Sequence, residues 1–260
     1  MHDGKQLLQA LDSLWEKYQK RLTDCHQRAN EEAVHKLRTG TRRFLALIEL
    51  LQALAPNASL KKLRKNLKKQ LDAFDDLRDT QVMLLEVSAS QAFLPELRPF
   101  WTHLQRREHD LLLETPANLA EINLEKLESR IIQAKQQLAS DLGKHSLKSA
   151  ILAVIDEVYQ VVLSRYQTID VAHSSTIHRT RIAVKKLRYL LESGESLLPP
   201  LPVQHLENLQ AYLTRMGEIQ DSSVLLLHLK TFYGQELPLS VQTHYQHRHS
   251  SLLNAFMLQR

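Results

Sequence analysis

Leucines spaced three and four residues apart run along most of this 260-residue chain. In the segment 58–74 the apolar side chains fall on one side of a helix, at Leu60, Leu63, Leu67, Leu71 and Phe74, and lysines occupy another side, at Lys61, Lys65 and Lys68. This period of 3.6 residues predicts amphipathic helices. The chain has only six glycines, which also favours helix over sheet. We therefore expect an all-α protein with about ten or eleven helices.

Proline and turn residues divide this helical pattern into segments. The predicted breaks are Ala55-Pro56-Asn57, Pro95, Thr115-Pro116, Ser193-Gly194, Pro199–Pro202 and Pro238. Asn57 or Ser59 is expected to cap the helix that follows the first break.

A basic helical motif occurs twice. His35-x2-Arg38-x3-Arg42-Arg43 returns 143 residues later as His178-x2-Arg181-x3-Lys185-Lys186. Positions three and seven residues after a histidine lie on its side of a helix, so each copy gathers an imidazole and cations on one face. Such a face suits a multiply charged anion better than it suits a core.

Two further motifs repeat in the same order, at nearly the same offset. They are Leu71-x5-Leu77-x-Asp79-x2-Val82 with Leu213-x5-Ile219-x-Asp221-x2-Val224, and Thr102-His103-x-Gln105-x-Arg107 with Thr243-His244-x-Gln246-x-Arg248. We predict two copies of one helical unit, at about residues 1–118 and 142–260, joined through a helix at about 119–141. The copies are expected to share one core around a pseudo-twofold axis, which would bring the two basic faces into one groove.

The charge is concentrated locally. The formal net charge is +5, but between His35 and Gln70 there are ten Lys/Arg and a single acid, Glu49. This distribution predicts a polyanion site. Cys25 is the only cysteine, which excludes an internal disulfide and a multi-cysteine zinc site. No signal peptide or membrane-spanning stretch is evident, so we expect a cytoplasmic protein.

These motifs resemble the CHAD family, the conserved histidine α-helical domain. The resemblance rests on Val34-His35-x2-Arg38-x3-Arg42-Arg43, on Ile177-His178-x2-Arg181-x3-Lys185-Lys186-x-Arg188, and on the signatures Leu77-Arg78-Asp79 and Ile219-Gln220-Asp221. It covers essentially the whole chain and implies one CHAD domain over residues 1–260, built of two pseudo-twofold-related four-helix bundles. Gln220 departs from the Arg-Asp signature.

The resemblance implies non-enzymatic binding of inorganic polyphosphate in a basic cleft or pore, with targeting to polyphosphate granules or regulation of the polymer. The expected phosphate ligands are basic side chains from both copies: His35, Arg38, Arg42, Arg43, Lys62, Lys65, Lys69, Arg107, His178, Arg181, Lys185, Lys186, Arg188 and Arg248. Arginines donate in a fork to phosphate oxygens, and lysines act as mobile point charges. A polyanion favours the protonated imidazole, so binding should tighten as the pH falls through about 6.5.

Other interpretations stay open for these residues. His35 and His178 can instead be hydrogen-bonded to a carboxylate or carbonyl, and the lysines can form an ordinary solvated face. Asp79 and Asp221 are expected to be structural, as caps or as carboxylates that orient an arginine. The first copy is expected to hold the polymer more strongly, because Val203–Ala211 lacks the lysines of Leu60–Leu71.

Rival functions have less support. Nucleic-acid binding is the main alternative, but only 6% of the residues are aromatic and few lie among the cations. Catalysis is weakly supported, since the chain has no GxxxxGK[ST] loop and no evident carboxylate cluster for Mg²⁺. An accessory module of a phosphate-related enzyme is a further alternative. We expect no cofactor, and His244 with His247 lacks the additional ligands that a metal site needs.

Overall fold

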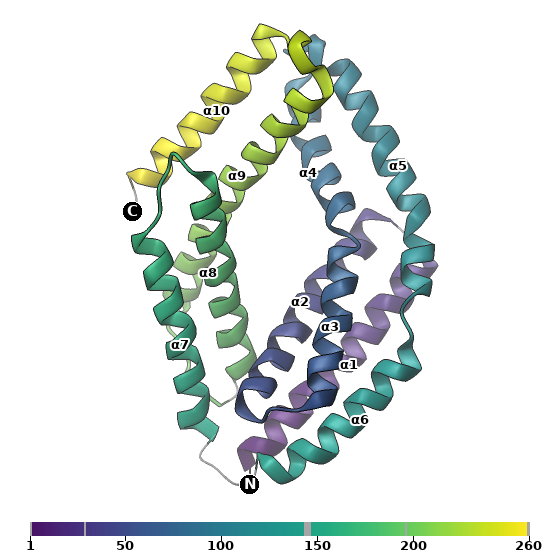
Figure 1. The fold of residues 1–260 in the computed structure, drawn as a ribbon, viewed down its shortest axis with the longest axis vertical. Coiled ribbons are helices and arrows are strands. Elements are labelled where there is room, and N and C mark those ends of the chain that lie inside the picture. The colour runs from purple at the N-terminus through teal and green to yellow at the C-terminus, as the bar shows by residue number, and fades with distance from the viewer. Residues whose placement is uncertain (1, 29, 143–146, 196, 259–260) are drawn as a thin grey trace. The chain divides into compact units, whose positions relative to one another are not determined.

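The computed structural model describes residues 2–28, 30–142, 147–195 and 197–258. Over these residues it contains ten α-helices, two short 3-10 helices and no strand, which confirms the all-α prediction (Figure 1). The helices are α1 (His2–Gln27), α2 (Glu31–Leu54), α3 (Ala58–Asp72), α4 (Asp75–Ser90), η1 (Pro95–Leu97), α5 (Arg98–Ala120), α6 (Leu124–Asp141), α7 (Leu147–Gln167), α8 (Ser174–Gly194), α9 (Val203–Tyr233), η2 (Gly234–Glu236) and α10 (Leu239–Met257).

The chain divides into two compact units. Unit 1 comprises Met1–Asp75, Leu112–Val161 and Lys186–Leu201, and unit 2 comprises Asp76–Leu111, Val162–Lys185 and Pro202–Arg260. Packing defines these units, and each takes segments from both predicted repeats. The repeat boundaries therefore stay a prediction. Helix α6 lies within the segment 119–141 that is predicted to connect the copies.

Unit 1 contains a four-helix bundle. Helix α1 packs against α2 and α6, and α3 packs against the same two helices. Leu60, Leu63 and Leu67 are fully buried in this bundle, so the amphipathic pattern of α3 turns its lysines outward. Inside, the Tyr18 hydroxyl donates to Gln70 Oε1 at 2.8 Å, and burial raises the pKa of Tyr18.

Unit 2 has two apolar clusters, and α9 and α10 contribute to both. The first joins side chains of α4, α5, α9 and α10, including Val87, Phe100, Leu229 and Tyr245. The second joins α8, α9 and α10 with the end of α7, around Met216. Helix α9 therefore contributes buried side chains to both apolar clusters of unit 2.

The predicted helix ends are mostly observed, with one correction. Asn57 caps α3, since its side-chain oxygen accepts from the backbone N–H groups of Ser59 and Leu60. The predicted break at Thr115-Pro116 is wrong, because α5 continues through Pro116 to Ala120. Because the helix continues past Pro116, Leu119 lies in the core at 1% exposure. The free energy gained by burying Leu119 offsets the loss of the backbone hydrogen bond that a proline cannot donate.

Candidate functional site

Arg38 of the first basic helix, α2, lies inside unit 1. Its side chain is 4% exposed; Nη1 donates to the carbonyl oxygen of Leu71 at 2.7 Å, and Nη2 pairs with Asp75 Oδ1 at 2.6 Å. Leu71 belongs to the last turn of α3, where carbonyl groups lack helical partners, and Asp75 begins α4. The Arg38 guanidinium therefore joins the end of one helix to the start of the next. No observation tests Arg38 as a phosphate ligand, but this conformation commits its guanidinium to internal contacts.

Four other predicted ligands, on α2 and on the unit 1 part of α8, also contact protein groups. His35 is exposed and Arg42 is half-buried, and both interact with other residues. Arg43 lies 3.6 Å from Glu192, and Arg188 pairs with the same carboxylate at 2.8 Å. The two basic helices thus share one acid inside unit 1.

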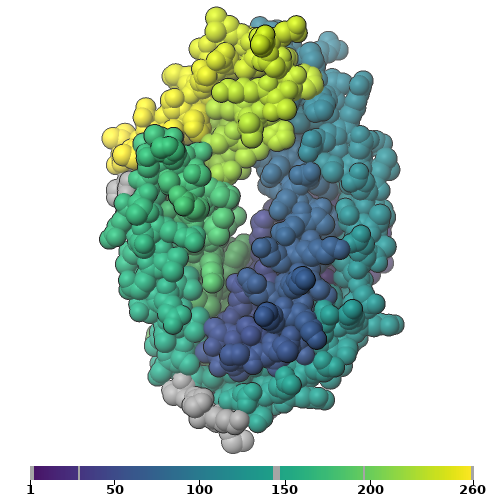
Figure 2. All heavy atoms as spheres, in the orientation of Figure 1, coloured from purple at the N-terminus to yellow at the C-terminus, as the bar shows by residue number. Residues whose placement is uncertain are grey.

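An exposed lysine face lies on α3, the helix whose dark blue atoms can be seen in Figure 2. We define this lysine face as Lys61, Lys62, Lys65 and Lys68. Within the described ranges, Lys62 and Lys65 have no salt-bridge partner, whereas the nearby Lys69 pairs with Glu121 at 2.8 Å. That hydrogen bond lowers the pKa of Glu121. The lysine face therefore keeps its positive charge largely uncompensated.

A second group of cations surrounds Asp221 in unit 2. The four cations that act on its carboxyl come from three helices, and we call them the cation cluster: Arg78 of α4, Arg181 and Lys185 of α8, and Arg248 of α10. Desolvation raises the pKa of Asp221 although all four cations act to lower it. Asp221 is exposed as a whole residue. The protein atoms packed near its carboxyl, and not complete burial of the side chain, therefore cause this desolvation. Four positive charges thus act on the carboxyl of Asp221.

Arg181 is the most closely packed member of the cation cluster. A Cβ built on Gly217 would lie 3.1 Å from its Nη2 atom, so the missing side chain lets the guanidinium lie directly on α9. Its Nε is buried and has no hydrogen-bond partner. Arg248 is held differently, since its Nη2 pairs with Glu86 at 2.8 Å. The cluster therefore contains a positioned arginine with donor capacity that the protein does not use.

His178 lies beside the cation cluster, and its pKa is lowered. Desolvation and the charge of Arg181 lower its pKa, a hydrogen bond with Gln220 raises it, and Lys185 lowers it further. Gln220 replaces the arginine of the Arg-Asp signature. An amide there partners the imidazole without adding another positive charge.

A different environment surrounds Arg107, another predicted ligand. Its Nη2 lies 3.4 Å from Asp76, and it neighbours His228 together with Asp79 and His103. Desolvation and Arg107 lower the pKa of His228, and the two aspartates oppose this shift. Two acids accompany the arginine here, so this group has little excess positive charge.

Sequence reasoning missed Arg78 as a site residue, although the Leu77-Arg78-Asp79 signature pointed to it. It also missed the acids that pair with the predicted ligands, because Asp75, Asp76, Glu86, Glu121 and Glu192 lie on other helices or loops. Within the part of the chain that the structure describes, no group of three or more His, Cys, Asp or Glu side chains could hold a metal ion. No helix among those residues is both long and apolar enough to span a membrane.

The helical fold and the cation cluster define an all-α protein with a concentrated positive site. The CHAD domain model matches residues 9–230, so the chain belongs to the CHAD family. Its fold is similar to the crystal structure of the CHAD domain from the plant Ricinus communis, with a TM-score of 0.73 and 18% identity over 98% of this chain and 87% of that one. It is also similar to PptA from Streptomyces chartreusis, with a TM-score of 0.66 and 14% identity over 98% of both chains. None of the curated proteins compared with the chain matches it.

Proposed function

We propose that this protein binds inorganic polyphosphate without catalysing its turnover, and that the cation cluster of unit 2 is a principal binding site. The observation that carries the proposal is the gathering of Arg78, Arg181, Lys185 and Arg248 around Asp221. Cations from three helices have no reason to converge for packing alone, because their mutual repulsion costs stability. A bound polyanion removes that cost.

The chemistry of the cluster fits a phosphate polymer. Polyphosphate carries negative charge on every unit and offers oxygens in all directions, so a surface with several donors can hold it in many registers. Arg181 supplies a positioned fork for bidentate donation, and Lys185 supplies a point charge one helical turn further along α8. The lysine face of α3 is a second, more mobile contact. We propose that the cation cluster is the stronger of the two, because its arginines lose less freedom on binding.

This arrangement favours polyphosphate over a nucleic acid strand. Binding of single strands usually combines backbone contacts with aromatic side chains on which bases stack. The cation cluster has four charged side chains and one acid, and none of these five residues is aromatic. Polyphosphate binding would recruit the protein to polyphosphate granules in the cytoplasm.

Competition on a labelled polyphosphate tests this function. Unlabelled long-chain polyphosphate and a mixed-sequence RNA are compared at near-physiological salt, each at matched phosphate concentration. We expect polyphosphate to displace the label at least about tenfold more effectively than RNA, because the site reads charge density and not bases. Equal displacement by both polymers would contradict the proposal and would show a generic cationic surface.

A further inference from the structure

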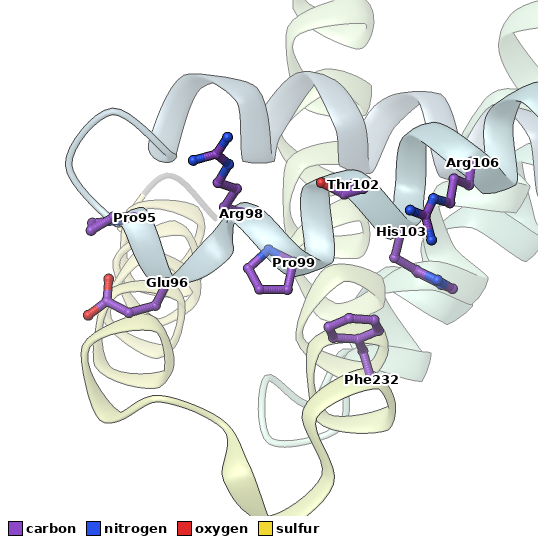
Figure 3. A pocket seen from close by; sticks show the side chains of 8 residues that line it. All are labelled: Pro95, Glu96, Arg98, Pro99, Thr102, His103, Arg106 and Phe232. Carbon is purple, nitrogen blue, oxygen red and sulfur yellow. The ribbon is translucent and has the colours of Figure 1, made fainter.

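A pocket of about 660 Å³ lies in unit 2 between the start of α5 and the end of α9 (Figure 3). Its lining contains no member of the cation cluster. The side chains that line it are Pro95, Glu96, Arg98, Pro99, Thr102, His103, Arg106 and Phe232. This volume falls in the range of small-molecule sites, which is about 300–1,000 Å³.

One wall of the pocket is aromatic. Phe232 is 38% exposed, although it belongs to a group of rings whose centroids lie close together. Its ring centroid lies 5.3 Å from that of Phe100 and 5.0 Å from that of His103. In Figure 3 the Phe232 ring lies across from Pro99, and His103 lies beside both. The buried neighbour Phe100 holds the ring in place, so the open surface of Phe232 is a platform for a flat ligand.

The α5 side of the pocket contributes two cations. Arg98 and Arg106 are two turns apart on α5, about 12 Å along the helix axis, and Thr102 lies between them. Across the described part of the chain, neither arginine forms a salt bridge, and the Arg106 guanidinium points toward His103 in Figure 3. The acid in the lining, Glu96, is engaged elsewhere, since its carboxylate accepts from Ser240 Oγ at 2.9 Å.

We propose that this pocket binds a nucleotide, with the base against Phe232 and the phosphates at the cations of α5. An inorganic phosphate chain would leave the aromatic platform unused, and a neutral aromatic molecule would leave the arginines without an anion. A nucleotide can stack its base on Phe232 and place its phosphates at the arginines of α5. Stacking on an exposed aromatic ring is tolerant of the base, and arginine forks bind phosphate oxygens. This site goes beyond polyphosphate binding and shares no residue with it.

Calorimetric titration of the full-length protein tests the pocket with three probes: ATP, adenosine and inorganic triphosphate, all without Mg²⁺. The titrations use the Arg181→Gln/Lys185→Gln double variant, which weakens binding of any phosphate chain at the cation cluster. We expect ATP to bind at least about tenfold more tightly than either half, because only ATP uses both walls. ATP binding no tighter than triphosphate binding would overturn the proposal, whatever the outcome for polyphosphate.

Point variants of the two walls then locate the binding. Phe232→Leu keeps an apolar side chain against Phe100 but removes the stacking ring, and Arg106→Gln removes a charge. Each should weaken ATP binding about tenfold, while Phe232→Leu leaves triphosphate binding unchanged. Matched controls are Phe93→Leu, an exposed phenylalanine outside the pocket, and Arg215→Gln, an exposed arginine earlier on α9. Equal ATP affinity in the wall variants and the controls, at unchanged melting temperature, would refute the site.

Discussion

Arg38 and Arg181 occupy the same position of the repeated basic motif, but their surroundings differ. Arg38 is 4% exposed and is held by the Leu71 carbonyl and Asp75. Arg181 is half-buried, lies on Gly217 and leaves its Nε without a partner. The offset of the second repeated motif pairs Leu71 with Leu213 and therefore Asp75 with Gly217. Where the first copy has the carboxylate that binds the arginine, the second copy has no side chain at all.

This difference shows that arginines at the same position of a repeated motif can have two different roles. In the first copy the internal acid commits the arginine to the fold. In the second copy the missing acid leaves Arg181 against a glycine, among the cations that act on the carboxyl of Asp221. A motif therefore identifies a candidate ligand, and the residue that faces it decides whether that ligand is available.

The largest expected effect is on stability at Arg38. Arg38→Met removes a buried charged donor that serves both the Leu71 carbonyl and Asp75, so we expect a loss of about 2–4 kcal/mol in the free energy of unfolding. Arg181→Met should lose less than about 1 kcal/mol, because Arg181 makes fewer internal contacts. Urea denaturation followed by circular dichroism measures both. Equal losses of unfolding free energy in the two variants would contradict the proposed difference between Arg38 and Arg181.

The next effect is on binding, at the glycine beneath Arg181. Gly217→Asp supplies the carboxylate that Asp75 provides in the first copy, so it should pair with Arg181 and weaken polyphosphate binding about tenfold. Gly217→Ala adds only a Cβ at 3.1 Å from Nη2 and should change affinity less than about threefold. Calorimetry on both variants separates charge from crowding. If Gly217→Ala weakened binding as much as Gly217→Asp, the charge explanation would be wrong.

A smaller effect is expected from pH. The pKa of His178 is lowered in the free protein, and a bound polyanion should raise it, so binding takes up a proton below about pH 6.5. Affinity should therefore rise a few-fold between pH 8 and pH 5.5, and His178→Gln should flatten the rise. Fluorescence titration measures the affinity across this pH range. If the affinity of His178→Gln depended on pH as strongly as that of the unchanged protein, the imidazole would not be the group that takes up the proton.

Stability should change in the opposite direction over the same range. The pKa values of His178, His228 and His249 are all lowered by burial, so the unfolded chain binds protons more readily than the folded one below about pH 6.5. The free energy of unfolding should then fall as the pH falls. A melting temperature that rose on acidification would contradict these environments.

The smallest effect is expected at the lysine face. Lys62→Gln/Lys65→Gln removes two exposed charges that have no salt-bridge partner among the described residues, and it should weaken polyphosphate binding only about two- to threefold. Salt titration should show a slightly reduced salt dependence. A loss of affinity larger than that of Gly217→Asp would show that the lysine face binds polyphosphate more strongly than the cation cluster. That is the order expected from the number of lysines in the sequence.

Much of the fold followed from the sequence, because leucine spacing and caps such as Asn57 act locally. Pro116 was mistaken for a break, since the burial of Leu119 that sustains α5 depends on tertiary packing. The site was harder to predict for the same reason. The acids Asp75 and Glu192 that engage Arg38 and Arg43 lie on other helices, far along the chain, so counting charges within one helix overstated its free cations.

The most direct test of the account is the affinity of the Arg181→Gln/Lys185→Gln variant for polyphosphate of defined length. Its matched control is Arg215→Gln/Lys230→Gln, which removes the same two charge types from exposed positions of α9. Calorimetry at near-physiological salt should show a loss of about tenfold or more for the cluster variant and less than about twofold for the control. Equal affinities for the two variants, with intact helical circular dichroism, would show that the cation cluster is not the binding site.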